Sequence, residues 1–351
     1  MQRGSSPRPI IEYVTTSDDG VNWIKIGDIP HFGRIVTSTE EKITKEGAKK
    51  SRQVNKGDLI LSNSMSYGLP YIMGIDGYIH DGWFVLKNFE NTFDKDYLCN
   101  LLISSAIQNQ YKRLAAGGVV QNISSDLVNS VSVSIPTMME QKKISSLLNL
   151  IDERIATQNK IIEDLKKLKS AISHILFSSK GAIHLSEIAN VVMGQSPSSN
   201  AYNDQGLGMP LVQGNLDISN GKTTPRLYTA EFNQTTEKGN IILTVRAPVG
   251  EVAKATQKVC LGRGVCAIIP HEENMSDFIY QYLTFYKFMW RRYEQGSTFT
   301  SINGSDVRNI FCPKVRNVSI LTLLDIKINI EERVVKQYQS QKQYMLYQMF
   351  I

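Results

Sequence analysis

The stretch GQSPSSNAYN, Gly194–Asn203, begins with a Gly-x-Ser-Pro motif that recurs in RGSSPRP at Arg3–Pro9. Other segments recur in the same order. NKGDLILS (55–62) matches EKGNIILT (237–244), KIGDI around Gly27 matches VQGNL around Gly214, and GGVVQNISSDL (117–127) matches GSTFTSINGSDV (296–307). The offset between partners falls steadily, from 190 at the first pair to 173 near the chain end. Chance matches would scatter, so the sequence predicts a duplicated unit.

Each copy is followed by a long helical pattern. Pro136 and Pro313 close the two copies, and Thr137 with Glu140 has the spacing of a capping box. Apolar residues then recur in a heptad pattern, and Gly181 is the expected stop. The positions in the first helix are Leu148, Ile151, Ile155, Ile162, Leu165, Ile172 and Leu176, and those in the second are Leu321, Leu324, Ile328, Val335, Tyr338, Met345 and Met349.

Polar residues interrupt both seams at matching places. Gln158 matches Glu331, and Lys169 matches Lys342, each at an offset of 173. Polar seam residues lower stability but fix register and partner choice. We therefore expect the two helices to pair as an antiparallel coiled coil with pseudo-twofold symmetry; the alternative is that each helix packs only on its own domain. The 34 positions of Ile144–Phe177 would form a helix about 50 Å long.

The predicted fold class is α+β, with two similar globular domains that are each followed by a long helix. The boundaries are 1–136 for the first domain, 137–180 for its helix, 181–313 for the second domain and 314–351 for its helix. The second copy has a lead-in, HLSEIANVVM, before its Gly-x-Ser-Pro, whereas the first begins almost directly at that motif. We therefore expect the first domain to lack an edge element, which makes its folding and activity less certain.

Composition excludes several classes of protein. The 351 residues are 42% hydrophobic, enough for two cores, and contain no apolar run of membrane-spanning length and no signal-peptide pattern. The four cysteines form no C-x-x-C pair and predict buried thiols in a reducing cytoplasm. The net charge of +6 lies wholly in 137–180 and 314–351, because each domain is balanced. Bulk charge alone therefore does not indicate nucleic-acid binding.

The segments that carry a family resemblance are RGSSPRP, NWIKIGDI, LSNSMSYGLPYIM, GQSPSSNAYNDQGLGMPLVQGNLD, GSTFTSIN and the helix from Glu140 to Phe177. In these segments the chain resembles the specificity subunit of type I restriction-modification systems. The resemblance covers nearly the whole chain and includes the order of the parts. It implies two target-recognition domains, 1–136 and 181–313, that each read one half of a bipartite, non-palindromic DNA site. It implies that the helices set the spacing and dock two methyltransferase subunits and the motor-endonuclease subunits. S-adenosylmethionine, ATP and Mg would belong to those partners.

Catalytic motifs are missing. No two prolines are adjacent, which excludes the Asn/Asp-Pro-Pro-aromatic loop of an amino-methyltransferase. GNLDISNGKTT lacks the first glycine of a phosphate loop, no G-x-S-x-G elbow occurs, and the histidines have no metal or catalytic partners at motif spacing. We expect a non-catalytic chain without a metal.

Candidate DNA-binding residues are polar or basic side chains in the recurring segments, where they could reach base edges or phosphates. In the first domain they are Lys49, Lys50, Arg52, Asn63, Ser64, Ser66 and Tyr67. In the second they are Ser196, Ser199, Tyr202, Asn203, Gln213, Asn215, Arg246, Arg291, Arg292, Ser297 and Thr298. The alternative for each group is a solvated charge run or a structural turn. Arg246 stands where the first copy has Ser64, as expected if a common framework carries different reading side chains.

Candidate docking residues lie on the outer face of the first helix: Lys142, Lys143, Lys166 and Lys167. Some of them could instead meet phosphates of the DNA between the half-sites. Three other functions stay open: a protein-interaction scaffold without DNA, an enzyme with an unrecognised site, and a specificity subunit of a related system whose modification and cleavage functions lie in one partner chain.

Overall fold

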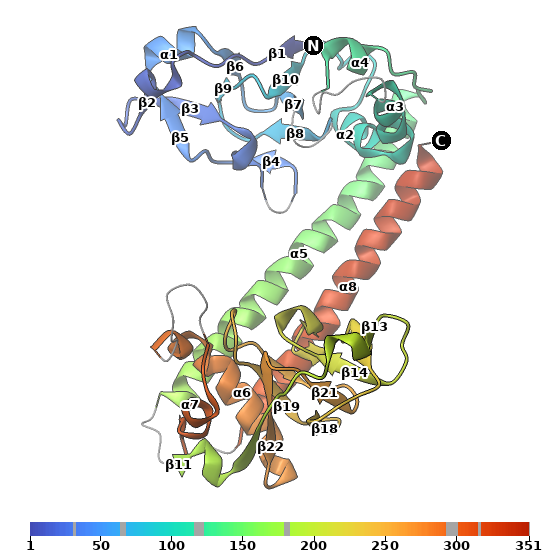
Figure 1. The fold of residues 1–351 in the computed structure, drawn as a ribbon. Coiled ribbons are helices and arrows are strands. Elements are labelled where there is room, and N and C mark those ends of the chain that lie inside the picture. Colours follow the sequence, from blue (N-terminus) through green and yellow to red (C-terminus); the bar gives the residue numbers. More distant parts are fainter. Residues whose placement is uncertain are drawn as a thin grey trace. The chain divides into compact units, whose positions relative to one another are not determined.

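The computed structural model describes residues 1–30, 33–63, 68–115, 123–178, 183–292, 301–314 and 317–350. The chain divides into two compact units (Figure 1). Unit 1 comprises Met1–Ile161 and Glu331–Ile351, and unit 2 comprises Ile162–Ile330. Each unit therefore contains one globular domain and a segment of each long helix.

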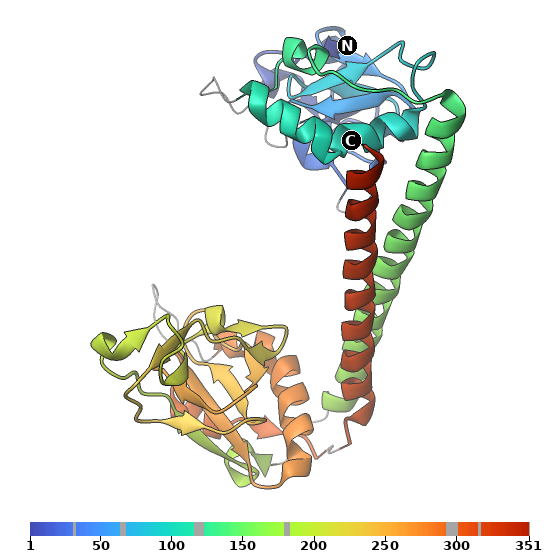
Figure 2. The ribbon, with the colours of Figure 1, turned by 90° about the vertical axis from the view of Figure 1, so that its right-hand side faces the viewer.

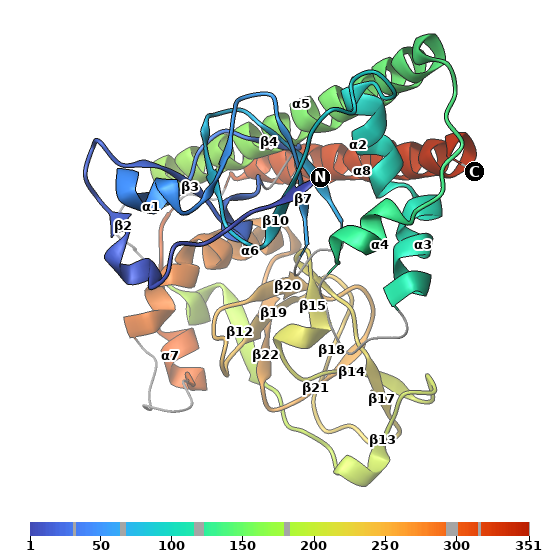
Figure 3. The same cartoon turned by 90° about the horizontal axis from the view of Figure 1, so that it is seen from above.

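Unit 1 contains two five-stranded sheets. The first has the order β1-β10-β7-β8-β4, with β1 at Gln2–Arg3, β10 at Trp83–Leu86, β7 at Leu59–Ser62, β8 at Pro70–Met73 and β4 at Ile35–Val36. The second has the order β2-β5-β3-β9-β6, with β2 at Val14–Thr15, β5 at Glu41–Ile43, β3 at Val21–Ile24, β9 at Gly77–Ile79 and β6 at Arg52–Val54. Helix α1 (Lys45–Lys49) precedes β6. Helices α2 (Lys95–Ile103), α3 (Ser105–Ala115) and α4 (Ser125–Asn129) gather away from α1 (Figures 1 and 3).

Unit 2 repeats this plan, with one sheet of six described strands and one of five. One sheet has the order β12-β22-β19-β20-β16-β15, with β12 at Ala189–Met193, β22 at Val265–Pro270, β19 at Ile241–Thr244, β20 at Val252–Lys254, β16 at Lys222–Thr223 and β15 at Ile218–Ser219 (Figure 3). The other has the order β13-β17-β14-β21-β18, with β13 at Tyr202–Asn203, β17 at Leu227–Thr229, β14 at Met209–Val212, β21 at Val259–Leu261 and β18 at Thr235–Thr236. Strands β11 (Ile183–His184) and β23 (Phe311–Cys312) pair separately, and α6 (Ser276–Tyr286) and α7 (Gly304–Arg308) complete the unit.

Matching hydrogen bonds confirm the predicted repeat. The hydroxyl that ends each recurring strand, Ser62 in β7 and Thr244 in β19, accepts the backbone N–H seven residues later, at 3.0 Å from Leu69 and 2.9 Å from Glu251. Both strands are buried throughout, so their apolar residues form part of the core of each unit. The α+β class is also confirmed, because each unit combines largely antiparallel sheets with separate helices.

Both predicted long helices form: α5 spans Met138–Phe177 and α8 spans Ser319–Met349. Thr137 is the predicted cap, since its hydroxyl and backbone N–H both donate to Glu140 Oε2, at 2.7 and 3.0 Å. Gly181, the expected stop, lies outside the described residues, and α5 has already ended at Phe177.

The α5 and α8 segments of each unit lie side by side (Figure 2). In unit 1, Lys342 Nζ contacts Asp152 Oδ2 at 2.8 Å, and Gln158 donates to Glu331. In unit 2, Lys169 Nζ lies 2.6 Å from Asp325 Oδ1. The partner number falls from 342 to 331 as the α5 number rises from 152 to 158, so the helices run antiparallel within unit 1. A supercoil with pseudo-twofold symmetry stays a prediction.

The charged contacts also attach each globular domain to the helices. In unit 1, Arg34 Nη2 donates to Asp152 Oδ2 at 2.7 Å, and Lys342 Nζ donates to the same carboxylate, so Asp152 neutralises both cations. In unit 2, Gln281 of α6 donates to Asp325 at 2.6 Å, beside Lys169. Burial lowers the pKa of Lys342, and the hydrogen bond and charge of Asp152 oppose that shift.

The first unit has a much shorter version of one strand. Strand β1 pairs two residues with β10, whereas β12 pairs five residues with the equivalent strand β22. The first domain was expected to lack an edge element, but the described structure has a short one there, since β1 pairs two residues with β10. The remaining strands of that sheet, β10, β7 and β8, stay paired and buried.

The four cysteines are unpaired and buried, as predicted. Burial raises the pKa of the Cys99 thiol to about 11 and those of Cys266 and Cys312 to about 12, so these thiols stay protonated at neutral pH. Trp23, Trp83 and Trp290 are also buried, which makes them core residues. Among the described residues, no helix is long and apolar enough to cross a membrane.

Candidate functional site

The Gly-x-Ser-Pro motif is a backbone clamp in both units. Gly194 donates its N–H to Val265 O (2.9 Å), and a Cβ on Gly194 would lie 2.1 Å from Gly262 O. Ser196 Oγ then accepts the backbone N–H of Arg263 at 3.0 Å. The motif therefore requires glycine for the close approach and serine to hold the loop at Arg263.

Unit 1 repeats each of these contacts. Gly4 donates to Trp83 O (2.8 Å), and a Cβ there would lie 2.0 Å from His80 O. Ser6 Oγ accepts the backbone N–H of Asp81 at 3.3 Å. Asp81 is thus the structural equivalent of Arg263, at the sequence offset of 182 that also relates the recurring strands.

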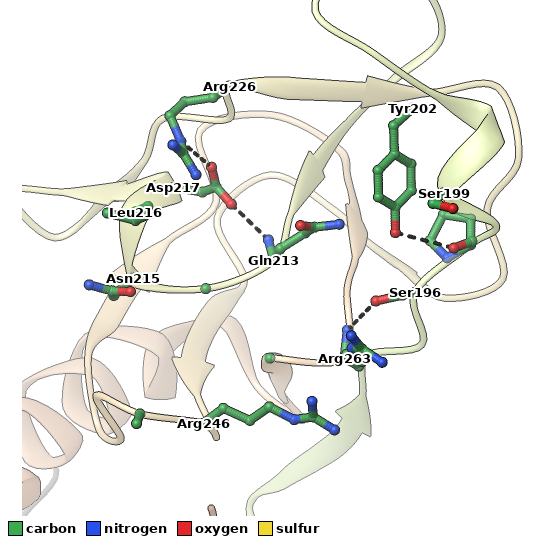
Figure 4. A pocket seen from close by; sticks show the side chains of 14 residues that line it. Ser196, Ser199, Tyr202, Gln213, Asn215, Leu216, Asp217, Arg226, Arg246 and Arg263 are labelled. Carbon is green, nitrogen blue, oxygen red and sulfur yellow. Dashed lines mark hydrogen bonds and ion pairs between the residues drawn. The ribbon is translucent and has the colours of Figure 1, made fainter. Parts of the chain in front are cut away.

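In unit 2 the clamp borders a hollow of about 670 Å³ (Figure 4). Its lining residues come from the clamp, from the end of β14 and from the loops after β19 and β21. Six predicted residues meet there: Ser196, Ser199, Tyr202, Gln213, Asn215 and Arg246. The structure adds Pro197, Gly214, Leu216, Asp217, Arg226, Ala247, Arg263 and Gly264.

The charge of this hollow is positive. Asp217 is buried, and its carboxylate is held by Arg226 Nε at 3.0 Å and by the backbone N–H of Gln213 at 2.9 Å (Figure 4). Arg246 and Arg263 are exposed, and among the described residues no side-chain contact engages either guanidinium. The hollow is therefore lined by two guanidiniums without a described counter-charge, two side-chain amides and three hydroxyls. Such a surface suits a ligand rich in hydrogen-bond acceptors.

Unit 1 carries an equivalent hollow of about 630 Å³. It is lined by Ser6, Pro7, Arg8, Pro9, Ile10, Trp23, Lys25, His80 and Asp81. Burial lowers the pKa of His80, although the charges of Asp81 and Asp28 oppose the shift. Burial alone would raise the pKa of Asp81, but the hydrogen bond from Ser6 and the charge of His80 outweigh it and lower that pKa. Asp81 is therefore an anion at neutral pH, in the place where unit 2 has a cation.

Comparison with known proteins identifies the duplicated architecture. The family model for the type I restriction modification DNA specificity domain matches residues 10–167 and again residues 181–337, which together cover most of the chain.

The chain belongs to the family of type I restriction-modification specificity subunits.

Individual relatives agree with this assignment. The protein described as the MjaX specificity subunit of a type I restriction enzyme, from Methanocaldococcus jannaschii, is 29% identical over 334 residues, which cover 87% of this chain and 76% of the relative. The MjaVIII specificity subunit from the same organism is 26% identical over 180 residues, 48% of this chain and 42% of the relative.

Solved structures show the same fold. A chain from a study of assembly and conformational transition in the type I R-M system aligns with a TM-score of 0.64 at 20% identity, covering 99% of this chain and 93% of that chain. The S subunit of a type I system from M. genitalium aligns with a TM-score of 0.59 at 18% identity, covering 97% and 94%.

Some of the residues predicted to contact DNA have structural roles in this specificity subunit. Asn63 is buried and donates to Asp81 O at 2.8 Å. Asn203 donates to Leu207 O at 2.8 Å and accepts the N–H of Leu207 at 3.0 Å, so its amide organises its own loop and does not line the hollow. Contact of either amide with DNA stays a prediction.

The basic cluster of unit 1 lies beside the clamp. Lys49 is exposed at the end of α1, and Lys50 lies over the Tyr13 ring, 4.5 Å from its centroid, and hydrogen-bonds the Tyr13 hydroxyl. Arg52 Nε donates to Arg3 O at 3.3 Å. These residues border the Gly-x-Ser-Pro segment without lining the hollow of unit 1, and their contact with DNA stays a prediction.

Several predicted residues fall outside what the structure describes. Ser64, Ser66, Tyr67, Ser297 and Thr298 are outside the described residues, and the side chains of Arg291 and Arg292 are likewise not described.

The predicted docking lysines are exposed on α5. Lys142 and Lys143 border a shallow hollow with Met138, Met139 and Ser146. Lys167 forms an ion pair of 2.6 Å with Glu163, and Lys166 borders an apolar hollow of unit 2 that includes Phe285 and Phe288. Within the described ranges, no group of three or more acidic, histidine or cysteine side chains could hold a metal ion.

Sequence reasoning missed Arg263 and Asp81, although the signal was present. The stretch HDG at His80–Gly82 and the stretch GRG at Gly262–Gly264 follow matching strands at the offset of 182. Continuing the offset of 182 for 19 residues beyond Ser62 and Thr244 identifies them. Arg226 and Asp217 had no such signal, because their pairing depends on how the segment between β14 and β17, which contains β15 and β16, folds back.

Proposed function

We propose that this chain recognises a bipartite, non-palindromic DNA site, with one half read by each unit, and that it positions modification and restriction subunits there. One observation carries the proposal. Both units hold a hollow on the same backbone clamp, but the side chains that project from the clamp differ, with Asp81 in one unit and Arg263 in the other. A common framework with different contacts suits two readers of different half-sites.

The chemistry of the hollow in unit 2 supports contact with DNA. Arg246 and Arg263 can donate to phosphate oxygens or to guanine, and the amides of Gln213 and Asn215 can both donate and accept at base edges. The second domain has equal numbers of acidic and basic side chains, so the positive charge at this hollow is a local excess. Binding should therefore weaken with salt as phosphate contacts release counterions.

The long helices support docking of two copies of one partner. Leu147 and Leu150 on α5 are 40% and 59% exposed. Their counterparts at the offset of 173, Ile320 and Leu323 on α8, are 49% and 63% exposed. Isolated exposed leucines are ordinary, but matching apolar pairs in both copies suit two equivalent docking sites. We assign these sites to two methyltransferase subunits, with the four lysines of α5 contributing charge.

The chemistry would belong to the partners. An adenine inside a duplex must be flipped out of the helix before it can be methylated. The flipped base then has to enter a closed catalytic pocket. We therefore propose that this chain has no activity of its own, that S-adenosylmethionine is bound by the methyltransferases, and that ATP and Mg are used by the motor-endonuclease subunits. We place the complex in the cytoplasm, because its substrate is DNA and because the four cysteines of this chain are unpaired, as is usual in a reducing compartment.

The test is a map of methylated adenines in a host genome, with the chain expressed beside its modification subunit and then omitted. We expect a two-part motif with a fixed gap, present only when the chain is present. No methylation, from an assembled complex with a competent partner, would reject the proposal in favour of a protein-interaction scaffold.

A further inference from the structure

The two clamps hold one residue in the same backbone frame in each unit. Residue 81 of unit 1 and residue 263 of unit 2 both donate their backbone N–H to the motif serine, at 3.3 and 3.0 Å. The preceding residues, His80 and Gly262, donate to the ends of equivalent strands, at 3.3 Å to Ile24 O and 2.8 Å to Val212 O. The backbone at this position is therefore fixed, and only the side chain differs.

The side chains differ in the sign of their charge and in their hydrogen-bonding capacity. A guanidinium has five donors and no acceptor, whereas an ionised carboxylate only accepts. Arg263 is exposed and lines its hollow, and no described side chain engages its guanidinium. Asp81 is 43% exposed; its Oδ1 accepts from Ser6 at 2.8 Å, and its Oδ2 lies 3.6 Å from Arg8. Both carboxylate oxygens retain lone pairs for a further donor.

These capacities match different bases. Guanine presents two acceptors, N7 and O6, in the major groove, whereas cytosine and adenine each present an amino donor there. We propose that residues 81 and 263 are specificity-determining residues. Arg263 reads a guanine in one half-site, and Asp81 reads a base with an exposed amino group in the other. This inference rests on the proposed function and names the base chemistry that the hollows select.

The motif serines act as positioning residues in this scheme. Ser196 contacts only the backbone of Arg263 among the described side-chain contacts, so it fixes where the guanidinium begins without selecting a base. Ser6 contacts both the backbone and the carboxylate of Asp81. The side chain of residue 263 is therefore free to change without disturbing the clamp, and the Arg263→Gln variant should fold.

The test uses the reconstituted complex of the full chain with its modification subunits, which methylates a DNA library randomised at each half-site position in turn. The variants are Arg263→Gln, Arg263→Lys and Asp81→Asn, and the control is Lys258→Ala. Lys258 is an exposed cation of unit 2, paired with Glu237 at 2.6 Å, that does not line the hollow. Melting temperatures verify that each variant folds.

We expect Arg263→Gln to lower the preference for a G·C pair at one position by roughly tenfold or more, because it loses a bidentate contact. Arg263→Lys should lower it less, and Asp81→Asn should change the preference at one position in the other half only. The control should change neither.

Two outcomes would overturn the inference. One is a uniform loss of methylation on all sequences, which would assign Arg263 to a phosphate. The other is an unchanged preference in both halves. The proposed function fails separately, if the wild-type complex itself shows no two-part motif.

Discussion

Gln158 on α5 donates a side-chain hydrogen bond to the carboxylate of Glu331 on α8, and the two residues are 173 positions apart. The same offset relates the two copies of the helix, so Gln158 and Glu331 are equivalent positions that contact each other. Glu331 is 8% exposed, and its carboxylate is therefore sensitive to what faces it.

The Gln158→Glu variant should destabilise the chain, since two carboxylates would face each other at this contact. Like charges raise the pKa of one carboxyl in the folded state. The variant should therefore be about as stable as the wild type at acidic pH and should lose stability relative to it as pH rises through the raised pKa. The melting temperatures of the variant and the wild type are measured from pH 5 to pH 8. A difference in melting temperature that stays constant with pH would contradict the prediction.

Removing Asp152 should destabilise unit 1 by about 2 kcal/mol, because Arg34 and Lys342 would lose their common carboxylate while their side chains stay 17% and 16% exposed. Asp152→Ala and the equivalent Asp325→Ala in unit 2 are measured by urea unfolding. The control is Lys167→Ala, which breaks a largely exposed pair with Glu163 and should leave stability unchanged. Equal effects for all three variants would refute the argument from burial.

Gly194→Ala and Gly4→Ala should each destabilise by about 1–3 kcal/mol, since a Cβ would meet backbone oxygens at 2.1 and 2.0 Å. The matched control is Gly214→Ala, where no atom lies within 4 Å of the added Cβ. The melting temperatures of the three variants are compared with that of the wild type, and only the control should be unchanged. Tolerance of alanine at Gly194 would mean that the clamp is not required for folding.

The apolar pairs on the helices predict the number of bound methyltransferase subunits. Leu147→Asn with Leu150→Asn should remove one subunit, Ile320→Asn with Leu323→Asn should remove the other, and all four changes should remove both. Native mass spectrometry of the complexes counts the subunits, and the control is Lys258→Ala, which changes an exposed cation of unit 2 outside both long helices. Retention of two subunits by the fourfold variant would place docking elsewhere.

Much of the fold was predictable from local signals. The Thr137 cap, the buried strands and the repeat each depend on residues close in sequence or at a fixed offset, and the structure confirms them. The bridge from Arg34 to Asp152 was not predictable, because it joins residues 118 positions apart without any periodic pattern.

The candidate site was only partly predictable. Composition identifies Asn63 and Asn203 as polar turn residues, but it cannot tell an amide that reads a ligand from one that bonds its own backbone. Six polar residues of unit 2 were predicted and do line one hollow. Arg263 was missed because the matched segment ends at Thr244, 19 residues before it.

The proposed function requires that each unit reads one half of the DNA site. The most direct measurement replaces residues 181–313 with the corresponding segment of a related specificity subunit and maps methylated adenines in cells that also express the modification subunit. We expect one half of the motif to change, while the other half and the gap between them stay the same. A motif in which both halves change would contradict it.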